Sequence, residues 1–215
     1  MTCELSQRLE AAPIVPLIDP ADPASAVQTA QALAAGGLNV IEVVMRSPAA
    51  QAGMEAVVAQ TSDVMVGAGT VLTLEQARAV HASGAQFIVS PGLIDDIALY
   101  CLAEGIPCLP GTMTPSEMQR AHTLGLRTVK FFPAGLAGGT SLLKAVSGVF
   151  RELRFMPTGG ISAENLADYL ALPNVLACGG SWLTPKETIA AKDYALITAL
   201  AREALMLAHD TRRAS

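Results

Sequence analysis

Short runs rich in β-branched residues alternate with longer stretches rich in alanine and leucine, and this alternation repeats eight times along the 215 residues. The longer stretches place apolar residues at i, i+3 and i+4 spacing, which indicates amphipathic helices. The short runs, which we expect to be strands, cover residues 14–18, 39–45, 64–69, 86–92, 107–111, 128–135, 154–160 and 175–180. Their spacing is that of strand–helix units joined by short loops.

Eight such units predict an α/β fold of the (β/α)₈ TIM-barrel class, as a single domain over residues 1–215. A short helix over residues 3–11 is expected to precede the first strand. The structural alternative is an open, doubly wound sheet. Eight units exceed what most such sheets carry, and no G-x-G-x-x-G follows the first strand.

The composition is 51% apolar and 15% charged, with a mean hydropathy of +0.41. Such values fit a membrane protein or a sheet that is buried on both faces. No run approaches 18 uncharged apolar residues, which argues against a membrane span. The first residues lack the basic and apolar regions of a secretory signal. A net charge of −5 and 4% aromatic residues argue against nucleic acid as a partner.

The cysteines and histidines predict neither disulfides nor a metal site. The cysteines form no C-x-x-C pair, which favours reduced, buried thiols in a cytoplasmic protein. The histidines lie in helical stretches without the spacing of metal ligands. These residues are Cys3, Cys101, Cys108, Cys178, His81, His122 and His209. The polar C-terminal residues 208–215 are expected to fray.

Among the four lysines, Lys130 alone lies inside a predicted strand, between Val129 and Phe131. A buried ammonium group is costly unless it is paired or loses its proton. A lysine in such surroundings can attack a carbonyl group and form a Schiff base. The alternative is a lysine whose stem lines the barrel while its head pairs with a carboxylate. We favour the nucleophile.

Glu42 is the only acidic residue inside an apolar strand. It is a candidate to pair with Lys130 or to act as a general acid and base. A purely structural ion pair is the alternative. Arg46 follows at the end of the same strand, where its guanidinium suits a substrate carboxylate. A surface arginine that opens the next helix fits the spacing equally well.

Two Gly-Gly steps end the seventh and eighth predicted strands, within Pro157–Ser162 and Cys178–Trp182. Barrels of this class commonly bind phosphate there. Glycines let backbone N–H groups approach an anion, and a helix expected to open after Ser162 would add its dipole. The two steps together predict a phosphorylated ligand, while tight turns alone are the alternative. Trp182 is expected to pack at the barrel rim.

Seven segments in order resemble the bacterial 2-keto-3-deoxy-6-phosphogluconate (KDPG) aldolases, which also act as 4-hydroxy-2-oxoglutarate (KHG) aldolases. The resemblance spans nearly the whole chain and implies a class I aldolase, a carbon–carbon lyase of the Entner–Doudoroff pathway and carbohydrate metabolism. It implies no metal or cofactor, and a homotrimer. The segments are Glu42–Arg46, Gly67–Thr70, Ser90–Gly92, Pro110–Gly111, Lys130–Pro133, Pro157–Gly160 and Gly179–Trp182.

The resemblance also implies a role for each matching residue. Lys130 would form the Schiff base and Glu42 would transfer protons, through a water molecule. Arg46, Thr70 and Pro91 would surround the pyruvate carboxylate, and Phe132 would pack beside the lysine. Thr158 would contact the hydroxylated part of the substrate. Gly159, Gly160, Gly180 and Ser181 would hold the phosphate.

Three other functions remain open on the sequence. A sister family acts on the C4 epimer, 2-keto-3-deoxy-6-phosphogalactonate, but tends to lack a threonine at the position of Thr158. A phosphosugar isomerase or synthase barrel would share the phosphate site without a Schiff base. A silent phosphate-binding barrel would serve as a sensor. The chain departs from close relatives at Gly135, where they tend to carry an acid, and this leaves the role of the loop over residues 135–139 open.

Overall fold

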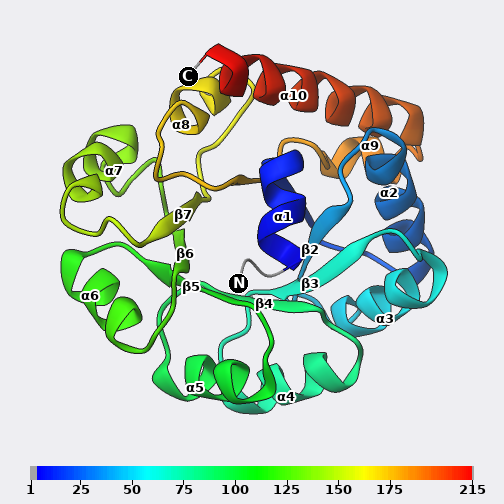
Figure 1. Ribbon diagram of the computed structural model, residues 1–215. Coiled ribbons are helices and arrows are strands. Elements are labelled where there is room, and N and C mark those ends of the chain that lie inside the picture. The colour runs from blue at the N-terminus through cyan, green and yellow to red at the C-terminus, as the bar shows by residue number, and fades with distance from the viewer. Residues whose placement is uncertain (1–3, 215) are drawn as a thin grey trace.

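The computed structural model describes residues 4–214 and confirms a (β/α)₈ barrel (Figure 1). Eight parallel strands pair in the order β7-β6-β5-β4-β3-β2-β1-β8. The strands are β1 (Ile14–Ile18), β2 (Val40–Val44), β3 (Met65–Gly69), β4 (Phe87–Ser90), β5 (Cys108–Thr112), β6 (Thr128–Phe131), β7 (Arg154–Pro157) and β8 (Cys178–Gly180). Two isolated bridges, Phe155 to Val175 and Thr158 to Gly179, link β7 to the β8 segment and nearly close the ring.

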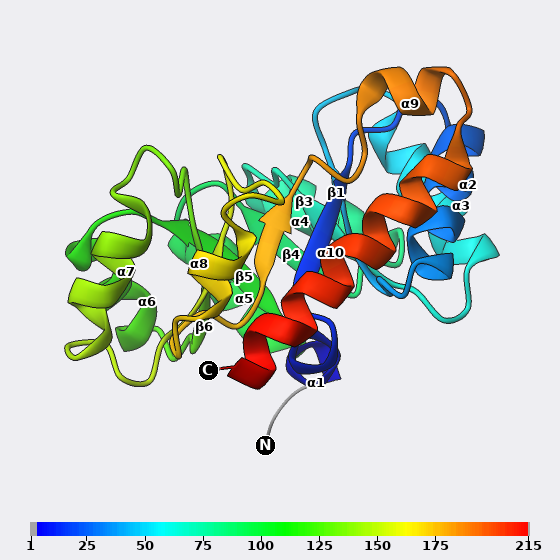
Figure 2. The same cartoon turned by 90° about the horizontal axis from the view of Figure 1, so that it is seen from above.

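Helices surround the ring, and a short helix covers one end of it (Figures 1 and 2). They are α1 (Glu4–Ala11), α2 (Pro23–Ala35), α3 (Ala50–Gln60), α4 (Leu74–Ala82), α5 (Asp95–Glu104), α6 (Pro115–Thr123), α7 (Gly139–Ser147), α8 (Leu166–Leu170), α9 (Lys186–Ala190) and α10 (Tyr194–Ala214). The expected N-terminal helix is therefore present from Glu4, while residue 3 lies outside the described part of the chain.

The strands are buried on both faces, which explains their almost unbroken apolar sequences. Residues such as Ile41 and Val43 point outward into the layer between strands and helices. Val40 points inward, into a second apolar cluster that also contains Leu5 and Leu9 of α1. Helix α1 thus plugs the strand-entry end of the barrel, and the opposite end, where the strands finish, is left for chemistry.

Two expectations about chain ends and helix starts are wrong. Residues 208–214 do not fray: they continue α10, and Arg212 donates hydrogen bonds to the carbonyls of Val175 and Leu176, at 2.7 and 3.0 Å. The helix expected after Ser162 begins only at Leu166, because turns occupy the intervening residues. It has five residues and begins at Leu166, so no helix dipole opens at the first Gly-Gly step, Gly159–Gly160.

The described cysteines are buried, as the sequence predicted: Cys101, Cys108 and Cys178. Cys3 lies outside the described residues, and the cytoplasmic location stays a prediction. In residues 4–214, no helix is both long and apolar enough to cross a membrane.

Candidate functional site

Lys130 and Glu42 meet inside the barrel. Lys130 lies in β6 and Glu42 in β2, and the Lys130 Nζ is 3.4 Å from the Glu42 Oε1. The lysine is 4% exposed and the glutamate is fully buried. Such a pair is stable only while both partners remain, because removal of one leaves a charge buried alone. The Glu42 Oε2 is also buried, and it has no hydrogen-bond partner in the part of the chain described. It is therefore free to accept a proton or a hydrogen bond.

Glycines of β3 make room for the carboxylate. A side chain at Gly69 would place its Cβ 2.0 Å from the Glu42 Oε1, which no real structure tolerates. Gly67, two residues earlier, makes room in the same way for the ring of Phe87. Both glycines therefore allow close packing against a neighbouring strand.

Two residues hold Lys130 from other sides. The Lys130 Nζ lies 5.4 Å from the centre of the Phe132 ring, a cation–π distance. The hydroxyl of Thr112 in β5 donates to the Lys130 carbonyl at 3.2 Å. The ammonium group therefore has a fixed place at the end of β6, between an aromatic face and a carboxylate.

Arg46 reaches the end of the neighbouring strand instead of opening the next helix. Its Nε donates to the Thr70 hydroxyl at 3.2 Å, and α3 begins four residues later, at Ala50. Thr70 has a backbone φ of 60°, which is strained for a β-branched residue. Strain of this kind persists where the surroundings impose it, and it commonly marks functional sites. Arg46 and Thr70 form a polar edge on the mouth beside Glu42.

The end of β4 lies beside the end of β5. The Ser90 hydroxyl donates to the Gly92 carbonyl at 2.7 Å. Gly111 brings the β5 backbone so close that an added Cβ would lie 2.0 Å from the Pro91 carbonyl oxygen. Pro91 is thereby fixed at the mouth by its neighbouring strand.

Thr158 follows β7 and is 4% exposed. Its hydroxyl is 3.4 Å from the Met156 carbonyl, a long hydrogen bond. A Cβ at Gly179 would lie 2.3 Å from the Thr158 Oγ1, so the glycine makes room for this hydroxyl. The bridge between Thr158 and Gly179 also brings the two Gly-Gly segments side by side.

The two Gly-Gly segments leave amide groups free at the mouth. Gly159 and Gly160 have φ values of 90° and 81°, which favour glycine. Their carbonyls accept hydrogen bonds from the Gly135 amide and the Asn165 side chain, at 2.9 and 2.8 Å. The N–H groups of Gly160 and Ser181, however, donate to no other residue within 4–214. Free amides beside occupied carbonyls are what an anion site requires.

Asn165 holds the first of these segments, and sequence reasoning missed it. Its Oδ1 accepts from the Ser162 amide at 2.9 Å, while its Nδ2 donates to the Gly160 carbonyl. The only available signal was an asparagine three residues after a serine, which is a common turn pattern. Ser162 is thus a turn residue held by Asn165, and not a helix cap.

Cys178 opens β8 behind the second segment. Burial raises the pKa of its thiol well above the ordinary value. The thiol therefore stays neutral and adds no negative charge behind the free amides.

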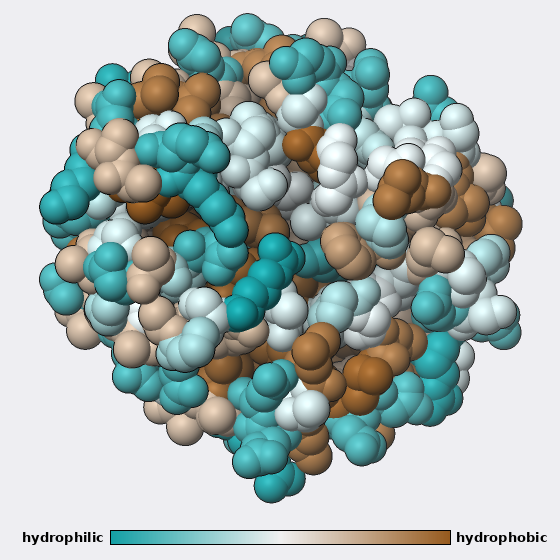
Figure 3. All heavy atoms as spheres, turned by 180° about the vertical axis from the view of Figure 1, so that it is seen from behind, coloured by the Kyte–Doolittle hydropathy of each residue, from teal (hydrophilic) through white to brown (hydrophobic). Residues whose placement is uncertain are grey.

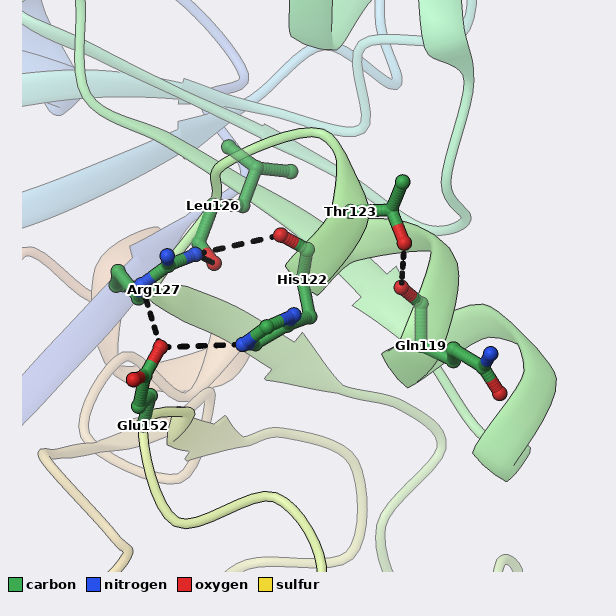
Figure 4. Close-up of polar contacts among 6 residues, drawn as sticks. All are labelled: Gln119, His122, Thr123, Leu126, Arg127 and Glu152. Atoms are coloured by element: carbon green, nitrogen blue, oxygen red, sulfur yellow. Dashed lines mark hydrogen bonds and ion pairs between the residues drawn. The ribbon is translucent and has the colours of Figure 1, made fainter.

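The histidines stand apart from this site. His122 pairs with Glu152 at 3.1 Å, and Arg127 approaches the same carboxylate at 3.3 Å (Figure 4). This network ties the end of α6 to the segment before β7, on the strand-entry side. Within the described residues, no group of three or more His, Cys, Asp or Glu side chains could hold a metal ion.

The chain matches a family model described as KDPG and KHG aldolase, over residues 5–200. It is 45% identical to the KHG/KDPG aldolase of Escherichia coli K12 over 197 residues, 92% of each chain. It is 43% identical to the 2-dehydro-3-deoxy-phosphogluconate aldolase of Treponema pallidum over 201 residues, 94% of this chain and 96% of the relative. Among solved structures it resembles the KDPG aldolase of Legionella pneumophila, with a TM-score of 0.91 and 39% identity, covering 94% of this chain and 98% of the other. That crystal structure contains pyruvate captured at low pH as a covalent carbinolamine intermediate.

Proposed function

Because the chain belongs to the KDPG and KHG aldolase family, we propose that Lys130 is the lysine that forms a Schiff base with the substrate ketone. The protein is a class I aldolase, a carbon–carbon lyase that cleaves KDPG into pyruvate and glyceraldehyde 3-phosphate. This reaction belongs to the Entner–Doudoroff pathway. The observation that carries the assignment of the lysine is the buried contact of 3.4 Å between Lys130 and Glu42.

The reaction begins when the unprotonated Lys130 Nζ attacks C2 of KDPG and forms a carbinolamine. Loss of water then gives an iminium ion, which accepts electrons from the adjacent carbon chain. The C3–C4 bond breaks as the C4 hydroxyl loses its proton, and glyceraldehyde 3-phosphate leaves as an aldehyde. The remaining enamine takes a proton at C3, and water hydrolyses it to pyruvate and free Lys130. This electron sink makes a metal or other cofactor unnecessary.

Glu42 is the proposed proton carrier. Its position beside Lys130 lets it accept the lysine proton before attack and, through a water molecule, the C4 hydroxyl proton during cleavage. Its free Oε2 supplies the second acceptor that these roles require. General acid–base catalysis of this kind contributes roughly 10²- to 10⁴-fold in rate.

The polar edge formed by Arg46 and Thr70 is proposed to bind the pyruvate carboxylate, with Pro91 closing the other side. A guanidinium group offers a carboxylate two parallel hydrogen bonds. The present bond between the Arg46 Nε and the Thr70 hydroxyl fixes the direction of the guanidinium. Phe132, whose ring centre lies 5.4 Å from the Lys130 Nζ, is proposed to pack beside the lysine.

Thr158 is proposed to contact the hydroxylated carbons of the substrate, which favours the gluconate-derived substrate over its C4 epimer. Thr158 is buried, and it lies two residues after Met156, which is in register with Lys130 of β6, and directly before Gly159. The same active site is expected to cleave KHG to pyruvate and glyoxylate, because that substrate shares the reacting carbons C1 to C4 and carries a carboxylate at C5 in place of the hydroxylated and phosphorylated carbons of KDPG.

Gly159, Gly160, Gly180 and Ser181 are proposed to bind the phosphate. The free amides of Gly160 and Ser181, together with the exposed Ser181 hydroxyl, are the supporting observation. An isomerase without a Schiff base could share this phosphate site, so the phosphate site alone does not identify the reaction.

A homotrimer is proposed as the assembly. Large apolar side chains remain exposed just beyond the ends of β3, β4 and β5, at Leu72, Ile94 and Met113. Apolar residues gather on the lower part of this face in Figure 3. Exposed apolar side chains that gather on one face commonly mark an interface between subunits. Light scattering on the purified protein should give three times the mass of one chain. Charged substitutions at these positions should reduce the measured mass to that of a single chain.

Borohydride reduction in the presence of pyruvate, followed by intact-mass and peptide mass spectrometry, tests the proposed function. We expect one reduced pyruvate per chain, attached to the peptide that carries Lys130. The matched control is Lys144, an exposed lysine of α7 that should remain unmodified. A folded protein that gives no adduct would favour an isomerase or synthase. An adduct on another lysine would mean that this lysine, and not Lys130, forms the Schiff base.

A further inference from the structure

Trp182 is the only tryptophan of the chain, and it lies two residues after Gly180, where β8 ends. The proposed reaction gives it no role. It is half-buried, and it packs against the outer apolar layer between the strands and the helices. It therefore belongs to the wall behind the phosphate site and not to the surface that faces the substrate.

The indole ring covers Gly180 directly. A Cβ added to Gly180 would lie 1.5 Å from the Trp182 Cζ3 and 2.1 Å from its Cε3. The six-membered part of the ring thus fills the space that any side chain at position 180 would need. On its other edge, Gly180 is in register with Pro16 of β1, so the glycine is held between a strand and an aromatic face.

Thr184 holds the next residue. Its amide and its hydroxyl both approach the Ser181 carbonyl, at 3.2 and 3.3 Å. The same hydroxyl is 2.6 Å from the Leu17 carbonyl of β1. The free Ser181 amide follows Gly180, which the indole ring covers. It precedes the Ser181 carbonyl, which Thr184 contacts. Its direction is therefore fixed before any ligand arrives.

We propose that Trp182 is a positioning residue, whose indole ring holds the Gly180–Ser181 backbone in the conformation that binds the substrate phosphate. This inference rests on the proposed function. The ring does not touch the phosphate. It limits the conformations open to a glycine, which otherwise samples many, and so lowers the entropy lost when the anion binds. Loss of the ring should weaken phosphate binding and leave the carbon chemistry unchanged.

The test compares Trp182→Ala with the wild-type enzyme on KDPG and on KHG, which has no phosphate. We expect KM for KDPG to rise about tenfold, which corresponds to about 1.4 kcal/mol, with kcat within about twofold. Both constants for KHG should stay within about twofold. Trp182→Phe keeps a six-membered ring and should recover most of the lost affinity.

Gly180→Ala approaches the same contact from the other side. Its methyl group must displace the indole ring, so it should reproduce the selective rise in KM for KDPG. Phe150→Ala is the matched control, because Phe150 is another partly buried aromatic residue of the same apolar layer and lies before β7. It should lower the melting temperature without changing the ratio of the two KM values. If Trp182→Ala does not fold, Trp182→Leu replaces it.

An equal rise in KM for both substrates would overturn the inference, and so would an unchanged KM for KDPG. Trapping of pyruvate by borohydride separates this failure from failure of the proposed function, because pyruvate carries no phosphate. Trp182→Ala should trap pyruvate at the wild-type rate. If the wild-type enzyme itself traps no pyruvate, the proposed Schiff-base reaction is ruled out.

Discussion

Lys130 and Glu42 meet inside the barrel as buried side chains, whereas the proposed phosphate site is made of backbone at the rim, where Gly160 and Ser181 are exposed. In the first region two strands bring opposite charges together, and neither charge is stable without the other. In the second, glycine conformations and a few held carbonyls leave amide groups free. The first should therefore govern the chemical step for every substrate. The second should govern affinity, and only for substrates with a phosphate.

Lys130→Met has the largest expected effect and should reduce the cleavage of both substrates equally. The methionine keeps most of the side-chain length but removes the nucleophile. We expect cleavage of KDPG and KHG to fall by about four orders of magnitude or more, with no borohydride adduct, as coupled assays and mass spectrometry would measure. Measurable trapping of pyruvate by this variant would show that another lysine reacts.

The same substitution should also reveal how far the two charges depend on each other. It leaves the Glu42 carboxylate buried without its partner, which typically costs about 3–5 kcal/mol. Denaturant unfolding should show this loss, and Glu42→Gln in the same chain should restore most of it. If the double variant is no more stable than Lys130→Met, the pair contributes nothing to the fold.

Glu42→Gln alone should affect the chemical step without preventing covalent binding. Removal of the proton carrier should lower kcat by about 10²- to 10⁴-fold for both substrates. Pyruvate should still be trapped on Lys130, more slowly. Steady-state kinetics and timed borohydride quenching separate the two effects. A change confined to KM would mean that Glu42 only binds substrate.

The difference between the two regions also explains what the sequence could predict. Lys130 and Glu42 stand out because burying a charge inside an apolar strand is costly unless the charge is paired. The structure brings the two residues together. The Gly-Gly steps stand out by residue type, but their conformations depend on tertiary contacts. Asn165 was missed because one asparagine in a loop carries little signal, and its contacts with Ser162 and Gly160 exist only in the folded loop.

The strands were predicted well because burial on both faces gives nearly continuous apolar runs. Local helix signals were less reliable. Ser162 has the residue type of a helix cap, yet Asn165 accepts the hydrogen bond of its amide and a turn follows. The polar C-terminal residues remain helical because Arg212 is anchored on carbonyls that are far away in the sequence.

Ser181→Ala tests the rim where it is proposed to touch the substrate. A hydrogen bond to a charged group contributes about 1.5–3 kcal/mol, so KM for KDPG should rise about tenfold or more. KM for KHG should remain near that of the wild type, since that substrate has no phosphate. Equal losses for both substrates would place the phosphate elsewhere and remove the contrast between the two regions.

Asn165→Ala should give the smallest effect, because Asn165 acts only through the loop that it holds. Its loss frees the Gly160 carbonyl and the Ser162 amide, so the adjacent free amides become less well ordered. We expect KM for KDPG to rise about two- to fivefold, a fraction of the 1.4 kcal/mol that a tenfold change represents, with KHG unaffected. Asn174→Ala is the matched control, since Asn174 is a buried asparagine that donates to the Leu143 carbonyl at 2.9 Å. It should lower stability without a selective effect on KDPG. If both variants change the two substrates alike, the loop contributes stability alone, and the phosphate affinity then depends on the Gly180–Ser181 side of the rim.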